Sequence, residues 1–190
     1  MIYLDIQHIG KPNKRKDMGA SIGDKPEQTE AYWTSLYAFF CEMKLRELGH
    51  EVMRITDGIY SSRHSRVNNY HSYREDQGVY ISCHINAGGG DKAIMFYDYR
   101  SLRGKELAKC ICTKLSELTQ ISTSTTMACR PDNWTKNAFN TIKSIQKPVA
   151  ICCEPFFIDN PRNQELLTFS NIKRVGELLA EGIHLWYNQN

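Results

Sequence analysis

The chain has 190 residues, of which 41% are hydrophobic and 24% are charged, and its formal net charge is +3. A chain of this length predicts one domain that can bury roughly 70% of the surface of the unfolded chain. The composition excludes a disordered, collagen-like or coiled-coil protein. So small a positive charge does not indicate a nucleic-acid-binding protein. We expect a monomer that binds no nucleic acid.

The sequence contains no pattern typical of a signal peptide or a membrane span. Residues 1–5 lack the basic region that precedes the apolar region of a signal peptide. No apolar run approaches the ~20 residues that cross a bilayer. The sequence therefore predicts a protein that is made in the cytoplasm and does not bind membranes. If it acts outside the cell, another factor must release it.

The seven cysteines are an odd number, and most of them lie in apolar runs. Free cysteine in such runs behaves as a small buried hydrophobic residue. The cysteine spacing matches neither a zinc finger nor a Cys-x-x-Cys pair. We therefore expect reduced thiols and no disulfide bond, as in a reducing compartment. The seven are Cys41, Cys83, Cys110, Cys112, Cys129, Cys152 and Cys153.

Predicted strands and helices alternate along the chain. Short apolar runs predict strands at residues 2–7, 51–55, 79–83, 93–97 and 149–153. Apolar residues recurring every three or four positions predict helices at residues 27–48 and 102–118, a polar helix at residues 61–73, and a helix at the C-terminus. This alternation predicts an α/β fold: one three-layer domain with a mainly parallel, twisted sheet flanked by helices.

Local signals mark the ends of some of these elements. Gly49 stands at the C-cap position of the first helix. Asp159-Asn160-Pro161 offers an N-cap followed by a first-turn proline ahead of the C-terminal helix. Residues 10–26 and 84–91 are predicted loops. Residues 123–146 show no clear pattern. The C-terminal helix has an apolar stripe of Ile172, Val175, Leu179, Ile183 and Trp186.

Three predicted strands run into residues that bind metals. His8 follows the first strand, His84 follows the strand at residues 79–83, and Glu154 follows the strand at residues 149–153. The carboxyl ends of parallel strands meet at one edge of an open α/β sheet. If these strands are parallel neighbours, the three side chains converge there. Glu30, near the start of the first helix, is placed to add one more ligand.

Each of these residues also has an ordinary structural explanation. A histidine after a strand often serves only as a hydrogen-bonding group, and a glutamate in a first helical turn favours the helix dipole. Glu154 is harder to explain in this way because its neighbours on both sides are apolar. A carboxylate in such a run is costly unless it is paired, hydrogen-bonded or bound to a metal. The pattern alone leaves a metal site and a purely structural role equally open.

Several motifs follow one another along nearly the whole chain. They are Asp5-Ile6-Gln7-His8-Ile9-Gly10; Glu30, 19 residues before Gly49-His50-Glu51-Val52; Arg54-Ile55-Thr56-Asp57 with Arg66-Val67; Ser82-Cys83-His84-Ile85-Asn86-Ala87; and Pro148-Val149-Ala150-Ile151-Cys152-Cys153-Glu154-Pro155-Phe156-Phe157-Ile158-Asp159-Asn160. In this order, the chain resembles the zinc-dependent N-acetylmuramoyl-L-alanine amidases of the type-3 group, which occur in bacterial cell-wall hydrolases and phage endolysins.

The chain departs from the family pattern around the proposed metal. Ile6, Gln7 and Ile9 replace a Pro and two Gly of the opening motif, and Pro155-Phe156 replaces the usual residue and Gly after the glutamate. We expect these changes to alter the loops. The four chemical positions are intact.

The resemblance implies one Zn²⁺ ion per chain, held by His8, Glu30 and His84 with a fourth position left for water. It implies Glu154 as the general base and as the group that returns the proton to the leaving nitrogen. The bond cut would join N-acetylmuramic acid to the L-alanine of the stem peptide in bacterial peptidoglycan. Asn86 is either a substrate contact or a turn-forming residue. Asp5 either orients His8 or simply forms a turn.

The other histidines are not needed for this site. His64 and His71 lie seven residues apart on a polar predicted helix, and no acidic or sulfur-bearing residue completes a tetrahedral ligand set with them. We therefore expect both to be exposed to solvent. His50 and His184 are expected to have structural roles.

The short segment between Ala87 and Ala93 leaves no room for the regulatory helix that some cell-division members of the family insert after the third ligand. The chain also ends about where the family's catalytic domain does. We expect residues 1–190 to form one catalytic domain without a separate cell-wall-binding domain, most like a phage endolysin. A prophage-derived or spore-related origin of the enzyme is an open alternative.

Two other functions are also possible interpretations of the sequence. One is a zinc peptidase acting within the stem peptide. The other is a non-catalytic wall-binding module, against which the presence of Glu154 argues.

Overall fold

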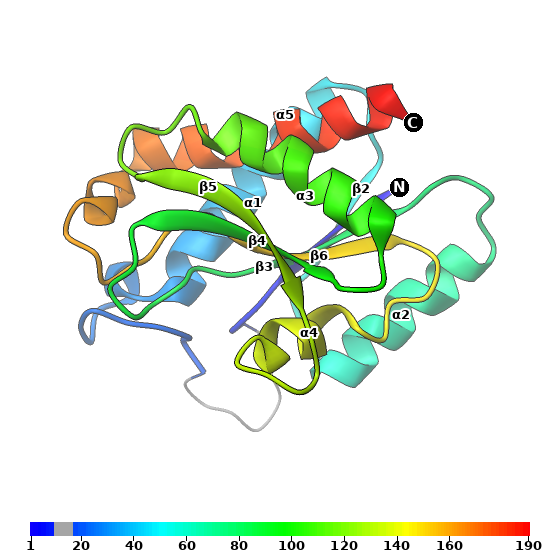
Figure 1. The fold of residues 1–190 in the computed structure, drawn as a ribbon, viewed down its shortest axis with the longest axis horizontal. Coiled ribbons are helices and arrows are strands. Elements are labelled where there is room, and N and C mark those ends of the chain that lie inside the picture. Colours follow the sequence, from blue (N-terminus) through cyan, green and yellow to red (C-terminus); the bar gives the residue numbers. More distant parts are fainter. Residues whose placement is uncertain (10–16) are drawn as a thin grey trace.

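A computed structural model describes residues 1–9 and 17–190 (Figure 1). The predicted loop at residues 10–26, and Gly10 of the opening motif, fall partly or wholly outside this range. The strands are β1 (Ile2–Ile6), β2 (Val52–Ile55), β3 (Val79–Cys83), β4 (Lys92–Asp98), β5 (Thr123–Cys129) and β6 (Val149–Glu154). The helices are α1 (Glu30–Glu47), α2 (Tyr60–Ser72), α3 (Leu102–Leu115), α4 (Lys136–Ile142) and α5 (Phe169–Gln189), with short 3₁₀ helices at Pro26–Gln28 and Asn163–Leu166.

The described strands form one sheet in the order β2-β1-β3-β6-β4-β5. β1 pairs in parallel with β2 and β3, β3 with β6, and β4 with β5, whereas β4 and β6 are antiparallel. The mainly parallel sheet predicted from the sequence is therefore confirmed, with one antiparallel pair. The carboxyl ends of β1, β3 and β6 meet at one edge, because these three strands are parallel neighbours.

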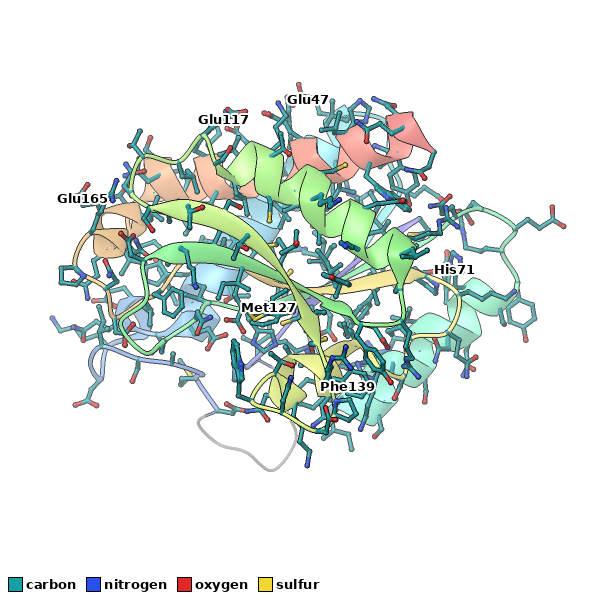
Figure 2. All side chains as sticks on the ribbon, viewed as in Figure 1. Glu47, His71, Glu117, Met127, Phe139 and Glu165 are labelled. Carbon is teal, nitrogen blue, oxygen red and sulfur yellow. The ribbon has the colours of Figure 1, made fainter. Side chains whose placement is uncertain are left out.

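Helices cover both faces of the sheet, which confirms the three-layer α/β architecture (Figure 1). Alternate residues of β1 face opposite layers, as the period of a strand requires. Ile2 and Leu4 pack into the core shared with α1, α3 and α5, while Tyr3 packs into a smaller core with residues of α2 and α4. Figure 2 shows His71 on α2 and Phe139 on α4 on the same side of the sheet.

Two elements lie in the region where the sequence shows no clear pattern. β5 and α4 both fall within residues 123–146. β5 is an edge strand and is mostly half-buried, while α4 has seven residues, of which Ala138, Phe139, Thr141 and Ile142 are buried. A half-buried Thr-rich strand and a helix of two turns show little hydrophobic periodicity, so neither was predicted.

The start of the C-terminal helix differs from the prediction. α5 begins at Phe169, where Thr168 is the N-cap and its hydroxyl accepts a hydrogen bond from the Asn171 amide. Asn160 instead stabilises the preceding turn, since its side-chain oxygen accepts hydrogen bonds from the backbone amides of Arg162 and Asn163. The predicted N-cap is therefore wrong: these residues form a turn ahead of the 3₁₀ helix at Asn163–Leu166, whose N-cap is Arg162.

The prediction for His64 and His71 was wrong. Their exposed fractions are 3% and 2%, because the polar helix α2 turns both side chains toward the protein interior. His64 Nε2 donates to the carbonyl of Thr141 at 2.9 Å, and His71 Nδ1 lies 3.0 Å from the Tyr3 hydroxyl. Each polar ring is therefore buried with a hydrogen-bond partner. His50 and His184 pair with each other, with Nε2 2.9 Å from Nδ1.

All seven cysteines are buried free thiols, as predicted. The described helices include none that is both long enough and apolar enough to span a bilayer.

Candidate functional site

Four side chains meet at the carboxyl edge of the central strands. His8 follows β1, His84 follows β3, Glu154 is the last residue of β6, and Glu30 is the first residue of α1. All four line one cavity of about 450 Å³. The structure thus brings together every side chain that the sequence analysis placed in the metal and catalytic sets.

Three of these side chains present their ligand atoms to one point. His8 Nε2 lies 3.3 Å from His84 Nδ1 and 3.4 Å from Glu30 Oε1, and His84 Nδ1 lies 3.1 Å from Glu30 Oε1. Donors ~2.0–2.1 Å from a tetrahedral Zn²⁺ ion stand ~3.3–3.4 Å apart. Two imidazoles and one carboxylate in this triangle therefore fit Zn²⁺ in both chemistry and spacing.

Glu30 is held in place by backbone amides as well as by the two histidines. Its Oε1 accepts a hydrogen bond from the Ile85 amide at 2.9 Å, and its Oε2 accepts one from the Ala20 amide at 2.8 Å. Burial by itself raises the pKa of Glu30, but hydrogen bonds to His8 and His84 outweigh burial and hold the pKa well below its usual range. The carboxylate is therefore ionised and rigidly oriented, as a metal ligand must be.

Gly19 allows the chain to pass close to this carboxylate. Its φ is +70°, and a Cβ atom there would stand 2.3 Å from Glu30 Oε2. Glycine meets both requirements, because it has no Cβ atom and adopts positive φ without strain.

His8 is oriented by an acidic residue that the sequence analysis did not identify. Its Nδ1 lies 2.8 Å from Asp17 Oδ1, on the ring nitrogen opposite the one that faces Glu30 and His84. Burial lowers the pKa of His8, yet the hydrogen bonds to Glu30 and Asp17 raise it above its ordinary value. A carboxylate on the second ring nitrogen fixes the tautomer of a metal-binding histidine.

Asp5 does not form a turn and does not contact His8, so neither role predicted for it is found. It lies within β1, fully buried, and pairs with the guanidinium of Arg63 on α2. Arg63 Nη1 also donates to the carbonyl of Ile6, and Nη2 donates to that of Ile9. Asp5 thus acts indirectly: it anchors the arginine that binds carbonyl groups on both sides of His8.

This clamp holds His8 in an unusual backbone conformation. The φ of His8 is +63°, and no other non-glycine residue among those described has a positive φ. Such a conformation persists only where the surrounding structure enforces it. The carbonyl contacts of Arg63 on either side of His8 supply that enforcement.

His84 is fixed through its backbone. Its amide donates to the Cys153 carbonyl of β6 at 2.9 Å, and its carbonyl accepts a hydrogen bond from the Tyr37 hydroxyl of α1 at 2.9 Å. Its Nδ1 faces Glu30, while its Nε2 is buried without a hydrogen-bond partner among the residues that the structure describes. The ring position is thus set by the two elements that also carry Glu30 and Glu154.

Glu154 is the half-buried carboxyl group of the cavity. Burial, followed by the negative charge of Glu30, raises its pKa to about 8, while His8 acts in the opposite direction. A carboxyl group with a pKa near neutrality can both take up and return a proton at working pH.

Asn86 lines the same cavity, but part of its side chain is already used by the loop. Its Oδ1 accepts a hydrogen bond from the Ala87 amide at 2.8 Å, and its backbone forms an isolated bridge with Phe157. The loop-forming role is therefore found, and the substrate contact remains a prediction.

Further cavity residues come from α2 and α4. They are Tyr60, Asn137, Ala138, Asn140 and Thr141. No sequence signal connects these residues to His8 or His84, because only the packing of α2 and α4 against the sheet brings them to the site. The Arg66–Asp57 pair noted among the motifs is an exposed ion pair at 2.7 Å.

Comparison with known proteins identifies the family of this chain. A family model described as N-acetylmuramoyl-L-alanine amidase matches residues 2–184. No curated protein matches the chain. Among solved structures, the amidase AmiC2 of Nostoc punctiforme has a TM-score of 0.76 and 17% identity, covering 100% of this chain and 97% of that one.

Two other structures are similar. The catalytic domain of the CD27L endolysin targeting Clostridia difficile has a TM-score of 0.63 and 22% identity, with 97% of this chain and 96% of that chain covered. Cwp6 from Clostridium difficile has a TM-score of 0.72 and 21% identity over 96% of this chain, which spans only 28% of Cwp6. At these identities the likeness shows a shared fold.

Proposed function

The chain belongs to the N-acetylmuramoyl-L-alanine amidase family, and from this premise we propose that it hydrolyses the amide bond between N-acetylmuramic acid and the L-alanine of the stem peptide. The observation that carries the proposal is the triangle of His8 Nε2, Glu30 Oε1 and His84 Nδ1, beside Glu154 in one cavity. Peptidoglycan is the substrate that the family implies.

We assign His8, Glu30 and His84 as the residues that hold one Zn²⁺ ion. Their donor types and spacing fit that ion, and the Asp17 carboxylate orients His8. When bound, Zn²⁺ would lower the pKa of a water molecule and polarise the amide carbonyl.

Glu154 carries the proton transfers in this proposal. Its carboxylate accepts a proton from the attacking water as the water oxygen bonds to the lactyl carbonyl carbon. It then gives that proton to the nitrogen of L-alanine as the carbon–nitrogen bond breaks. The products are a free lactyl carboxylate on the glycan and a stem peptide with a free amino terminus.

An endolysin role is the finer part of the proposal. It is supported by the likeness to the CD27L catalytic domain, which covers nearly all of both chains. Such a role predicts lysis of bacterial cells when the protein is added from outside or released from within.

Mass spectrometry of muropeptides tests the activity. Purified peptidoglycan is incubated with the protein, with and without a chelator, and with a His84→Ala variant as control. We expect new L-alanine amino termini and intact glycan strands with the wild-type protein, and neither product with chelator or with His84→Ala. New amino termini at another stem residue would indicate a peptidase instead. Binding to peptidoglycan without any cleavage would indicate a wall-binding module.

A further inference from the structure

Helix α4 brings two asparagine side chains to the cavity that contains His8, Glu30, His84 and Glu154. Asn137 and Asn140 both line this cavity. They are three positions apart in α4, so they lie on one face of the helix. The other side of α4 anchors the helix, since Phe139 and Ile142 pack into the smaller core. The pair therefore stands on a fixed support.

The amide groups of these two side chains are available to a ligand. Neither side chain forms a hydrogen bond with another residue in the described parts of the chain, and Asn140 is half-buried and Asn137 exposed. Asn86 and Asn133 differ, because their side-chain oxygens accept hydrogen bonds from backbone amides of Ala87 and Thr135. A free asparagine amide offers two donors and an acceptor.

The chemistry of the pair indicates what it binds. A secondary amide presents one N–H and one carbonyl group, which match the acceptor and donors of an asparagine side chain. The pair is uncharged, so it offers hydrogen bonds but no cation to pair with an anionic group. The substrate proposed above carries secondary amides in the stem peptide and in the N-acetyl groups of the glycan.

We propose that Asn137 and Asn140 bind secondary amide groups of the substrate and so position the scissile bond beside Glu154. The inference rests on the proposed function, whose substrate supplies these amides. The pair differs from an ordinary polar helix face because both side chains line the cavity that contains the proposed metal ligands.

Steady-state kinetics of Asn137→Ala, Asn140→Ala and the double variant test the proposal. The control is Asn69→Ala, an exposed helical asparagine on α2 that does not line the cavity. Two substrates are compared: N-acetylmuramoyl-tripeptide and N-acetylmuramoyl-L-alanine. Since a hydrogen bond contributes a net ~0.5–1.5 kcal/mol, each single variant should raise KM by about 2–10-fold, and the double variant should raise it further. We expect a smaller change in kcat, with unchanged zinc content and melting temperature.

The two substrates separate the two sources of the amide. A rise in KM for the tripeptide substrate alone assigns the pair to the stem peptide. A rise for both substrates assigns it to an amide that they share, in the N-acetyl group or at the lactyl–alanine bond. Wild-type KM values for both substrates with the double variant would overturn the proposal.

A binding measurement tests the role of the two asparagines independently of whether the proposed function is correct. Calorimetry with Glu154→Gln, with and without the two asparagine substitutions, gives dissociation constants for the same two compounds without turnover. Absence of cleavage by the wild-type protein would contradict the proposed function. Weaker binding on loss of Asn137 and Asn140 would still support the pair as an amide-binding site, and equal binding would exclude it.

Discussion

Arg63 and Asp5 form a fully buried ion pair, with Nη1 2.6 Å from Oδ1. Asp5 also accepts a hydrogen bond from the Tyr80 hydroxyl, and Arg63 Nε donates to the Gly58 carbonyl at 2.6 Å. The same guanidinium binds the carbonyls of Ile6 and Ile9 on either side of His8. One buried pair therefore links the core of the sheet to the conformation of a proposed metal ligand.

Replacing Arg63 should destabilise the protein strongly. Arg63→Met leaves the Asp5 carboxylate buried without its cation, and breaking such a pair costs about 3–5 kcal/mol. Urea unfolding measures the loss. Arg66→Met is the matched control, because Arg66 lies three residues further along α2 and its pair with Asp57 is exposed. It should change the free energy of unfolding little. Similar stabilities for the two variants would contradict the importance of the buried clamp.

Removal of Asp17 should weaken zinc binding without unfolding the protein. Asp17→Ala deletes the carboxylate 2.8 Å from His8 Nδ1. Loss of such a partner typically lowers metal affinity by ~10–100-fold. Competition with a chromogenic chelator measures the zinc dissociation constant. Asp24→Ala, an exposed loop carboxylate, serves as control. Equal affinities for Asp17→Ala and the wild-type protein would remove Asp17 from the site.

Two glycine substitutions separate backbone strain from damage to the metal site. Gly19 and Gly49 have φ values of +70° and +86°, so alanine is strained at both positions. A Cβ atom at Gly19 would clash with Glu30 Oε2, whereas no atom of the described residues beyond its chain neighbours lies within 4 Å of a Cβ atom at Gly49. We expect Gly19→Ala and Gly49→Ala both to lower the melting temperature, and only Gly19→Ala to lose zinc. Full zinc content in Gly19→Ala would show that Glu30 tolerates displacement or is not a ligand.

Glu154→Gln should abolish most of the activity while leaving zinc in place. Glutamine keeps the size of the side chain but cannot accept the proton, and a positioned general base contributes ~10²–10⁴ in rate. Turnover, zinc content and melting temperature are measured on one sample. Near-normal turnover with zinc bound would exclude Glu154 as the base. Loss of both zinc and activity would make it a ligand instead.

Buried His64 should make the protein less stable in mild acid. Burial lowers its pKa below its usual value of 6.5, with Arg63 and Lys143 adding to the effect and Asp5 and the Thr141 hydrogen bond opposing it. As the pH falls, the unfolded chain binds the proton first. The contribution of His64 to the free energy of unfolding is therefore at its full value above about pH 6.5, and it declines as the pH falls below that value. His71 contributes in the same direction.

Urea unfolding of the wild-type protein and His64→Gln between about pH 5 and pH 7 checks this dependence. Glutamine retains a donor for the Thr141 carbonyl but has no proton to gain. The variant should therefore show a shallower decline, with the remainder due to other groups such as His71. Identical slopes for the two proteins would show that His64 does not titrate differently on folding.

The sequence by itself predicts the features that depend on local pattern. Apolar runs indicated the central strands, and residues directly after or ending them indicated His8, His84 and Glu154 as one cluster. This inference succeeds because parallel neighbouring strands bring their carboxyl ends together whatever the detailed packing. The core location of the cysteines follows from a similar local signal, since most of them lie in apolar runs and all seven are buried.

Tertiary packing alone decided the rest. The pairing of Asp5 with Arg63 joins residues 58 positions apart, and the burial of His64 and His71 depends on how a polar helix meets the sheet. The sequence of helix α4 shows no clear hydrophobic periodicity. The helix nevertheless brings Asn137 and Asn140 to the cavity, because its apolar residues pack on the sheet beside β6. Contacts between distant segments depend on how whole helices and sheet faces fit together. Local hydrophobic periodicity indicates which residues are buried, but it does not indicate which polar groups come into contact across those faces.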